Sequence, residues 1–210
     1  RQLTYKEKDT EPEKNQDRKA ENMIDMAFVS RFCSGDKEAF YGLVTRYKGQ
    51  VFGIVRKFFS NQQDTEDISQ EIFINLFKAL PGFRGSSMFF TWFYRLIINT
   101  CLHHKRGIRH KEALMPERKE AYLEIPDYSG NPLALIEKKE FSGKLQEALN
   151  VLPGNLKAAL VLREIEGLSY GEIAAVQGVS LGTVKSRIHN GRVLLGEELK
   201  KRVQNSEDQE

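Results

Sequence analysis

The fold of the C-terminal part of the chain is decided by the stretch L168-S-Y-G-E-I-A-A-V-Q-G-V-S-L-G-T-V-K-S-R-I-H189. Ser169 is a residue type that caps the start of a helix, and Gly178 suits the left-handed turn that ends one. Ala174, Gly178 and Val184 have the spacing at which two helices cross closely. The stretch therefore predicts a helix-turn-helix.

The second helix of this motif separates an apolar stripe, which includes Val184, Ile188 and Leu195, from a polar face. Side chains off that stripe can donate hydrogen bonds to phosphates and base edges, and the start of such a helix enters the major groove of DNA. The alternative is a helical hairpin with an ordinary solvated basic face. The predicted DNA-binding residues are Ser180, Thr183, Lys185, Ser186, Arg187, His189, Asn190 and Arg192.

Composition places the chain among globular proteins. It has 210 residues, of which 40% are hydrophobic, and its formal net charge of +3 is only weak evidence for an anionic partner. No apolar run approaches the roughly 20 residues of a membrane span, and no signal-peptide pattern is found, so we expect no membrane insertion and a cytoplasmic location. Cys33 and Cys101 lie too far apart in sequence to indicate a disulfide framework or a thiolate zinc site.

Charge, proline content and apolar periodicity divide the chain into five segments. Residues 1–22 are charged, mixed in sign and nearly free of apolar residues, which predicts a disordered arm. Helical apolar spacing runs through residues 23–106 and resumes over residues 132–202. Prolines interrupt the intervening residues 107–131, and residues 203–210 form a polar tail. The predicted fold is all-α, with two small helical domains joined by an irregular linker.

A second basic surface is predicted in the first domain, because residues 84–111 contain six lysines and arginines and no acidic residue. On a helix starting near Thr91, an aromatic side chain and several cations share one outward stripe, which suits a nucleic-acid backbone and an unstacked base. The alternative is a partly buried Trp92 with solubilising charges around it. The predicted contacts lie on this stripe and in the loop before it: Arg84, Ser86, Ser87, Met88, Trp92, Arg95, Asn99 and Arg106.

The segment D64-T-E-D-I-S-Q-E-I-F-I-N-L-F-K-A-L80 carries four acidic residues and one basic residue, so its charge is opposite to that of the basic surface. Acidic groups in the first turn, such as Asp64, suit the helix macrodipole. Asp67 and Glu71 are four residues apart on one helix face, where their repulsion costs a few tenths of a kcal/mol. A basic protein partner explains this pair better than stability does. The predicted protein-binding surface comprises Asp64, Asp67, Gln70, Glu71 and Ile74.

Other classes of function have less support. No nucleophile, base and orienting group recur at useful spacing, and no glycine-rich phosphate loop is present, so we predict neither an enzyme nor a cofactor. A metal site is one interpretation of Cys101, His103, His104 and His110, but the lack of a further acidic or thiolate ligand nearby favours an ordinary basic helix end. A stand-alone helix-turn-helix regulator would require a ligand or receiver domain, and no βαβ pattern precedes the motif.

Four ordered motifs together resemble bacterial RNA polymerase sigma factors of the extracytoplasmic function group. The first three are G35-D-K-E-A-F-Y-G-L-V-T-R-Y47, D64-T-E-D-I-S-Q-E-I-F73 and F83-R-G-S-S-M-F-F-T-W-F-Y-R-L-I-I-N99. The fourth runs from L152-P-G-N-L156 through E166-G-L-S-Y-G-E-I-A174 to G182-T-V-K-S-R187. The resemblance extends from about residue 23 to residue 200.

This resemblance implies a protein that binds core RNA polymerase and directs promoter-specific initiation in an envelope or environmental stress response, under an anti-sigma factor. The acidic helix is similar to the part that grips the β′ clamp helices. Residues 83–99 are similar to the part that melts the minus-10 element. Residues 169–192 resemble the part that reads the minus-35 element, in a domain that docks on the β flap.

The end of the recognition helix departs from the family pattern. It reads I188-H-N-G-R192, where family members often have a run of arginine and alanine. Asn190 offers a neutral amide where a cation is common, and Gly191 weakens an isolated helix by up to about 1 kcal/mol relative to alanine. These differences leave the minus-35 sequence undetermined.

Overall fold

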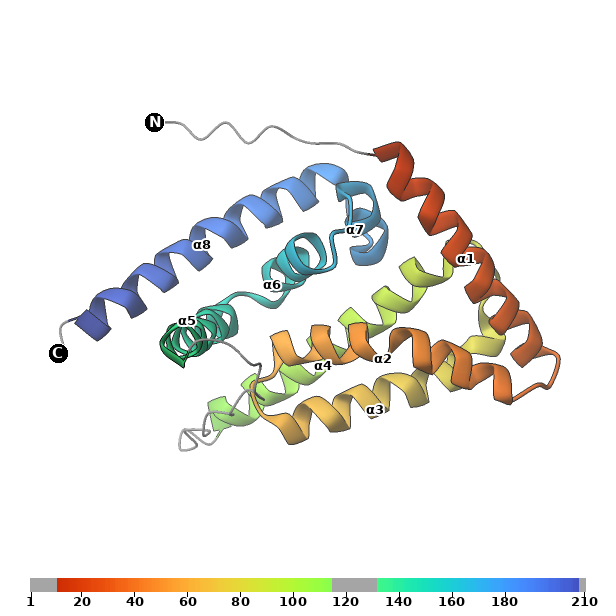
Figure 1. Cartoon of the computed structure of the whole chain (residues 1–210), viewed down its shortest axis with the longest axis horizontal. Coiled ribbons are helices and arrows are strands. Elements are labelled where there is room, and N and C mark those ends of the chain that lie inside the picture. The colour runs from red at the N-terminus through yellow and green to blue at the C-terminus, as the bar shows by residue number, and fades with distance from the viewer. Residues whose placement is uncertain (1–10, 115–131, 208–210) are drawn as a thin grey trace.

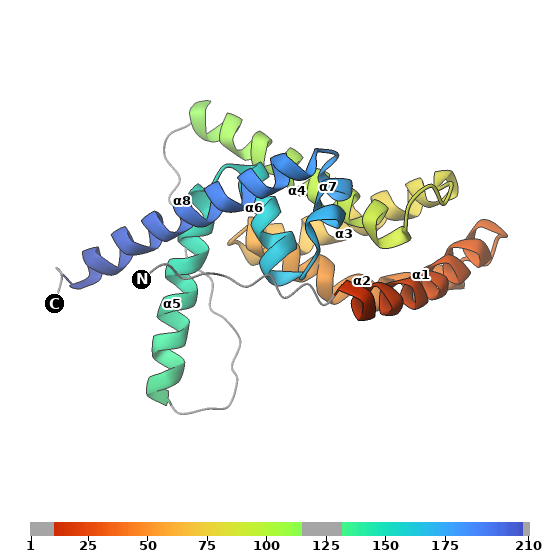
Figure 2. The ribbon, with the colours of Figure 1, turned by 90° about the horizontal axis from the view of Figure 1, so that it is seen from above.

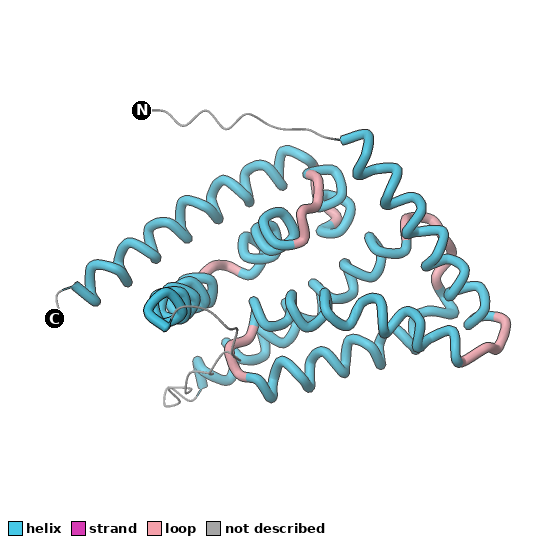
Figure 3. Tube along the Cα trace, viewed as in Figure 1, coloured by secondary structure: helices cyan, strands magenta, loops and turns pink. Residues whose placement is uncertain are grey.

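In the parts that the structure describes, every regular element is a helix, and short loops join the helices (Figures 1 and 3). The computed structural model describes the backbone of residues 11–114 and 132–207, and the side chains of residues 17–107 and 141–204. The all-α prediction is confirmed. The α-helices are α1 (Glu11–Cys33), α2 (Glu38–Phe58), α3 (Gln62–Ala79), α4 (Phe89–Leu114), α5 (Pro132–Val151), α6 (Gly154–Leu160), α7 (Tyr170–Gln177) and α8 (Leu181–Glu207), with short η1 (Leu80–Gly82) and η2 (Val161–Ile165) turns of helix after α3 and α6.

The helices form two bundles, an N-terminal bundle of α1–α4 and a C-terminal bundle of α5–α8 (Figure 1). In the first, α2 packs between α1 and α3, and α4 contacts all three; in the second, α8 packs against α5, α6 and α7. The bundles also touch each other, because α4 contacts α6 and α7 while α2 contacts α5 (Figure 2). One continuous apolar core therefore runs from Val29 in α1 to Ile188 in α8.

A buried carboxylate fixes α1 on α2. Asp25 is only 1% exposed, and it accepts hydrogen bonds from the Tyr47 hydroxyl at 2.7 Å and from Nε of Arg46 at 2.9 Å. Tyr47 also packs edge-on against Phe89 and Phe93 of α4, with ring centroids 5.6 and 5.2 Å apart. A charge buried in this way is tolerated only when it is fully paired, so the network specifies where α1 sits.

The helix-turn-helix forms as its capping residues predict. Ser169 and Glu172 make a reciprocal capping box at the start of α7, and Gly178 ends that helix at a φ of 66°. Ser180 accepts the backbone N–H of Thr183 at 3.2 Å and so caps α8. Val184 is fully buried against the domain core, as the apolar stripe requires.

Two segments expected to be irregular are partly helical, and a helix also continues into the predicted polar tail. The predicted disordered arm is helical over residues 11–22, where tertiary contacts described below hold the start of α1. Helix α4 continues through residues 107–114 of the predicted linker, which contain no proline. Helix α8 extends through residues 203–207 of the predicted tail. Residues 1–10, 115–131 and 208–210 lie outside the described residues.

The C-terminal bundle caps the end of α2. The carbonyl oxygen of Lys57 accepts from Nε2 of Gln146 at 3.1 Å, and the hydroxyl of Ser60 accepts from Nδ2 of Asn150 at 2.6 Å. The Lys157 side chain is completely buried, and its Nζ lies 3.0 Å from Oδ1 of Asn150 and 3.5 Å from the Phe58 carbonyl. Carbonyls at a helix C-terminus lack intrahelical donors and carry partial negative charge, so these groups match them.

The N-terminal bundle caps α7 in the same manner. The Arg95 guanidinium of α4 donates to the carbonyl of Val176 at 3.3 Å and to the carbonyl of Ala175, both in the last turn of α7. Beside it, the Tyr94 hydroxyl donates to Oε2 of Glu166 at 2.7 Å. The two bundles thus exchange helix caps across their contact.

Gly191 is a packing residue. It is buried, and a Cβ built on it would lie 3.0 Å from two side-chain carbons of Leu160 in α6, whereas a Cβ on Gly196 would meet no atom within 4 Å. Gly196→Ala should therefore raise the free energy of unfolding by about 0.5–1 kcal/mol through helix propensity. Gly191→Ala should lower it by about 1 kcal/mol through overpacking. Urea denaturation measures both, and equal stabilisation by the two variants would contradict this packing role.

Glu166 should make the stability of the protein depend on pH. Desolvation raises the pKa of its carboxyl above the ordinary 4.5, and the Tyr94 hydrogen bond opposes this rise only in part. Because the folded state then holds the proton more tightly than the unfolded chain, this group adds stability as pH falls toward 4.5 and loses that contribution above its folded pKa. Arg18, Glu21, Arg46 and Tyr47 line the same cavity of about 360 Å³.

Glu166→Gln keeps an acceptor for Tyr94 and removes the partly buried charge. The variant should therefore unfold at higher urea than the wild type at pH 7, and the difference should shrink as pH falls toward 5. The measurement is urea denaturation at a series of pH values. A difference that grows toward acidic pH would contradict the assigned direction of the pKa shift.

Candidate nucleic-acid and protein interfaces

The outer face of α8 presents an exposed row of polar side chains. Lys185, Ser186, His189 and Asn190 are exposed, and Ser180 and Thr183 form the cap at the start of the helix. The buried Val184 and Ile188 hold the opposite face of α8 in the core of the bundle. The structure therefore brings these predicted DNA-binding residues onto one face and one end of a single helix.

The two arginines predicted on this face differ in their surroundings. Nη1 of Arg187 donates to Oε1 of Gln177 at 2.8 Å, so α7 holds the Arg187 side chain at the start of the predicted DNA-binding face. Arg192 instead forms an ion pair with Glu164, at 3.0 Å from Nε and 2.5 Å from Nη2. Arg187 is thus oriented by its neighbour, while Arg192 is engaged within its own bundle.

The loop before α4 is exposed and makes a tight turn. Arg84, Ser86 and Ser87 are exposed, Met88 is half-buried, and Gly85 has a φ of 67° that favours glycine. These side chains lie beside the first turn of α4. The arrangement is an open loop of small and cationic residues next to an aromatic cluster.

Trp92 is more enclosed than an outward stripe requires. It is half-buried, and its ring lies 4.9 Å from the Phe83 ring and 6.0 Å from the Phe89 ring, measured between centroids. Asn99 is exposed on the same side of α4. Trp92 therefore packs against the residues that flank the loop, and only part of its ring is exposed.

The cations of α4 also have partners inside the protein. Arg95 caps the end of α7, as described above, and Nε of Arg106 donates to the Leu102 carbonyl at 3.3 Å. Arg95 lies on the predicted nucleic-acid stripe but is held by the other bundle in this structure. Its guanidinium cannot serve both contacts at once.

Most residues of the acidic face of α3 are exposed, and one of them, Glu71, has a partner within the protein. Asp67 and Gln70 are exposed, Asp64 is half-exposed, and Ile74 is 46% exposed. The expected repulsion between Asp67 and Glu71 is offset at Glu71, since its Oε2 lies 2.8 Å from Nε2 of His104 in α4. The face combines carboxylates with an exposed apolar side chain, which suits a partner surface that is basic and partly apolar.

The members of the alternative metal set lie in different environments. Cys101 is buried, and desolvation raises the pKa of its thiol to about 12. His104 contacts Glu71, His103 is exposed, and the side chain of His110 lies outside the described residues. Within the described ranges, no three histidine, cysteine or acidic side chains are grouped so that they could hold a metal ion.

Sequence reasoning missed two residues beside the predicted surfaces and one residue at the contact between the bundles. Phe77 is 41% exposed and lies three residues after Ile74, so helical spacing alone could have added it to the acidic face. Gln177 holds Arg187, and nothing in a single sequence indicates that pairing. Arg18 lies in the segment expected to be disordered, yet it contacts Glu172 of the C-terminal bundle.

In the two described ranges of the chain, no helix combines the length and the apolar character needed to cross a bilayer.

Comparison with known families matches both bundles in order. Residues 43–110 match Sigma-70 region 2, and residues 142–195 match Sigma-70 region 4. The first match contains the acidic face, the loop and the basic stripe, and the second contains the helix-turn-helix.

Relatives are similar over most of their own length. The RNA polymerase sigma-H factor of Pseudomonas aeruginosa is 37% identical over 174 residues, which cover 80% of this chain and 90% of the relative. The ECF RNA polymerase sigma-E factor of Haemophilus influenzae is 36% identical over 84% of this chain and 95% of its own. The ECF RNA polymerase sigma-E factor of Escherichia coli K12 is 36% identical over 82% of this chain and 93% of the relative.

Solved structures share the fold. CnrH in complex with the cytosolic domain of CnrY aligns with a TM-score of 0.60 and 24% identity, over 85% of this chain and 98% of that one. The sigma factor RpoE of Bartonella quintana, in complex with the anti-sigma factor NepR, also aligns with a TM-score of 0.60. The identity is 21%, and the alignment covers 77% of this chain and 96% of that one. With the two region matches and the relatives above, the conclusion is that this chain belongs to the extracytoplasmic function group of sigma-70 family RNA polymerase sigma factors.

Proposed function

We propose that this protein binds core RNA polymerase and directs it to initiate at specific promoters. The observation that carries the proposal is the order of the two region matches, each on a bundle with an exposed polar surface suited to its part of the task. The N-terminal bundle offers an acidic face on α3 and a basic loop before α4. The C-terminal bundle offers the recognition helix α8.

Each surface takes one role in this proposal. The face of α3 around Asp67 and Ile74 binds the β′ clamp helices, because it joins carboxylates to exposed apolar area. The loop before α4 and the stripe around Asn99 engage the minus-10 element during melting. The exposed start of α8 around Lys185 and Arg187 reads the minus-35 element, while the same bundle docks on the β flap.

We further propose that the protein is located in the cytoplasm and that an anti-sigma factor regulates it. Its activity would serve an envelope or environmental stress response. One solved protein with this fold is a sigma factor in complex with the anti-sigma factor NepR, and another, CnrH, is in complex with the cytosolic domain of CnrY. A partner that covers the acidic face and the recognition helix together would prevent polymerase binding.

The decisive experiment is transcription in vitro from a genomic library with core enzyme, followed by mapping of start sites. We expect the protein to direct starts downstream of one shared pair of sequence elements. Core enzyme alone supplies the baseline. Random start sites, or a tight sequence-specific footprint on duplex DNA without core enzyme, would instead favour a stand-alone helix-turn-helix regulator.

Asp67→Lys should weaken core-polymerase binding at least about tenfold without lowering the melting temperature, because Asp67 is exposed and its reversal repels a basic partner. Glu71→Lys is a poorer test, since it also places a cation beside His104. Glu197→Lys, an equal charge change at an exposed site on α8, serves as the control. Titration of labelled protein with core enzyme measures the affinity, and equal affinities for Asp67→Lys and the control would contradict this role.

The two DNA surfaces should contribute to different steps. Arg187→Ala should weaken closed-complex formation by about 1–3 kcal/mol, the loss expected for a bidentate base contact. Asn99→Ala and Trp92→Ala should chiefly reduce opening, because unstacking a base costs a few kcal/mol that these side chains offset. A template already melted at the minus-10 element should therefore rescue the α4 variants and leave Arg187→Ala impaired.

Permanganate reactivity and run-off transcription on matched duplex and bubble templates measure these steps. Asn99→Ala is included because Asn99 is exposed, so its loss leaves the core intact, whereas half-buried Trp92 also supports Phe83. Equal rescue of Asn99→Ala and Arg187→Ala by the bubble would show that the division between melting and duplex recognition is wrong.

A further inference from the structure

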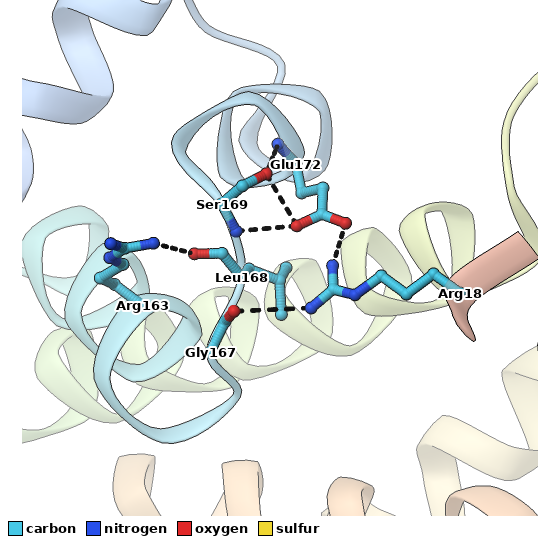
Figure 4. A network of polar contacts seen from close by, with 6 residues as sticks. All are labelled: Arg18, Arg163, Gly167, Leu168, Ser169 and Glu172. Atoms are coloured by element: carbon cyan, nitrogen blue, oxygen red, sulfur yellow. Dashed lines mark hydrogen bonds and ion pairs between the residues drawn. The ribbon is translucent and has the colours of Figure 1, made fainter. Parts of the chain in front are cut away.

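The start of α1 contacts both bundles, although it precedes the residues matched to either sigma region. The Arg18 guanidinium forms an ion pair with Glu172 and lies 3.5 Å from the carbonyl oxygen of Gly167 (Figure 4). It also lies over the Phe90 ring of α4, 5.2 Å from the centroid. Arg18 therefore occupies the junction of α1, α4 and α7.

The partner of Arg18 begins the helix-turn-helix. Glu172 accepts the backbone N–H of Ser169 at 2.7 Å with one carboxylate oxygen and contacts Arg18 with the other (Figure 4). Four residues after Arg18, the side chain of Asn22 accepts the backbone N–H of Phe89 at 2.7 Å, which caps the start of α4. Helix α1 is thus anchored to α4 through Asn22, and through Arg18 it contacts the first turn of α7.

The arrangement that α1 holds is incompatible with binding both promoter elements. Elements centred near minus 35 and minus 10 are about 25 base pairs apart, or about 85 Å along the duplex at 3.4 Å per base pair. In the structure, α7 of the minus-35 bundle packs directly on α4 of the minus-10 bundle. The same contact also occupies Arg95 of the predicted minus-10 stripe.

We propose that the first turns of α1 are an intramolecular latch, in which Arg18 holds the C-terminal bundle on the N-terminal bundle and keeps the protein in a closed resting state. The bundles separate when the protein binds polymerase, and the latch opposes that separation. The consequence for polymerase rests on the proposed function, whereas the closed state itself does not.

The Arg18 contact can be released without damage to the core. Its side chain is 20% exposed and that of Glu172 is 24% exposed, so water can replace the pair. Lys157 is completely buried, and truncating it would leave unsatisfied polar groups inside the interface. A switchable contact is expected at the rim of the interface, where Arg18 lies.

The test measures the distance between the bundles in the isolated full chain. Spin labels are placed at Lys78→Cys in α3 and Glu197→Cys in α8, both exposed positions, in a Cys33→Ser background that leaves only the buried Cys101. Pulsed electron resonance then gives the distribution of interspin distances. We expect one narrow distribution of distances for the unaltered latch and a second, longer population for Arg18→Ala.

The neighbouring Lys19→Ala is the matched control, because it removes the same charge from an exposed position of the same helix and leaves Arg18 in place. Alanine at either position preserves helix propensity. Arg18→Glu, which repels Glu172, should open the protein further than Arg18→Ala. High salt should open the unaltered protein toward the Arg18→Ala distribution, since the pair is partly exposed.

The second readout is the association rate with core polymerase. Arg18→Ala should associate about three- to tenfold faster than Lys19→Ala, because apparent association scales with the fraction of open protein. Identical distance distributions in the two variants, or a broad distribution in the unaltered protein, would overturn the latch. If no variant bound core enzyme, the proposed function would fail, and the distance distributions would still decide the latch.

Discussion

The last carbonyl groups of α2 and α7 have no donors within their own helices, and each set accepts hydrogen bonds from the opposite bundle. Gln146 and Lys157 serve the end of α2, and Arg95 serves the end of α7. An apolar contact alone would allow the bundles to slide, because apolar attraction has little directionality. Exchanged helix caps fix both the distance and the angle, so the placement of every exposed surface follows from them.

Under the proposed function and latch, the closed arrangement and the DNA-binding arrangement compete for the Arg95 guanidinium. Arg95 is bonded to α7 in the closed protein, whereas a role on the minus-10 stripe requires it to face nucleic acid. Glu71 has a related position, because His104 already holds a carboxylate that the acidic face offers to a partner. Binding of a partner must therefore replace internal contacts as well as form new ones, which lowers net affinity and sharpens dependence on the correct partner.

Local patterns were sufficient to predict the helix-turn-helix, because Ser169, Gly178 and Ser180 act through their own backbone neighbourhood. The apolar faces of α4 and α8 were equally accessible to helical spacing. The helical start of α1 could not be predicted from local patterns, because Arg18 contacts Glu172, which lies 154 residues away in the sequence. The role of Gly191 was hidden for the same reason. Judged by helix propensity alone it weakens α8, but the missing side chain lets Leu160 pack closely, and no local pattern encodes that contact.

The contact between the bundles combines polar bonds with a shared apolar core, and the polar bonds suit a protein that opens as the proposed latch requires. Arg18, Arg95 and Tyr94 each lose hydration on closing and regain it on opening, so the gross strength of their bonds largely cancels and the net free energy stays small. Glu166 adds an opposing effect, because burial beside Tyr94 disfavours its charged form. Apolar contacts have no such compensation, so the shared apolar core favours the closed protein. The balance between closed and open protein can then be shifted by a single rim contact such as that of Arg18, while the buried cap at Lys157 restores the same geometry each time the bundles meet.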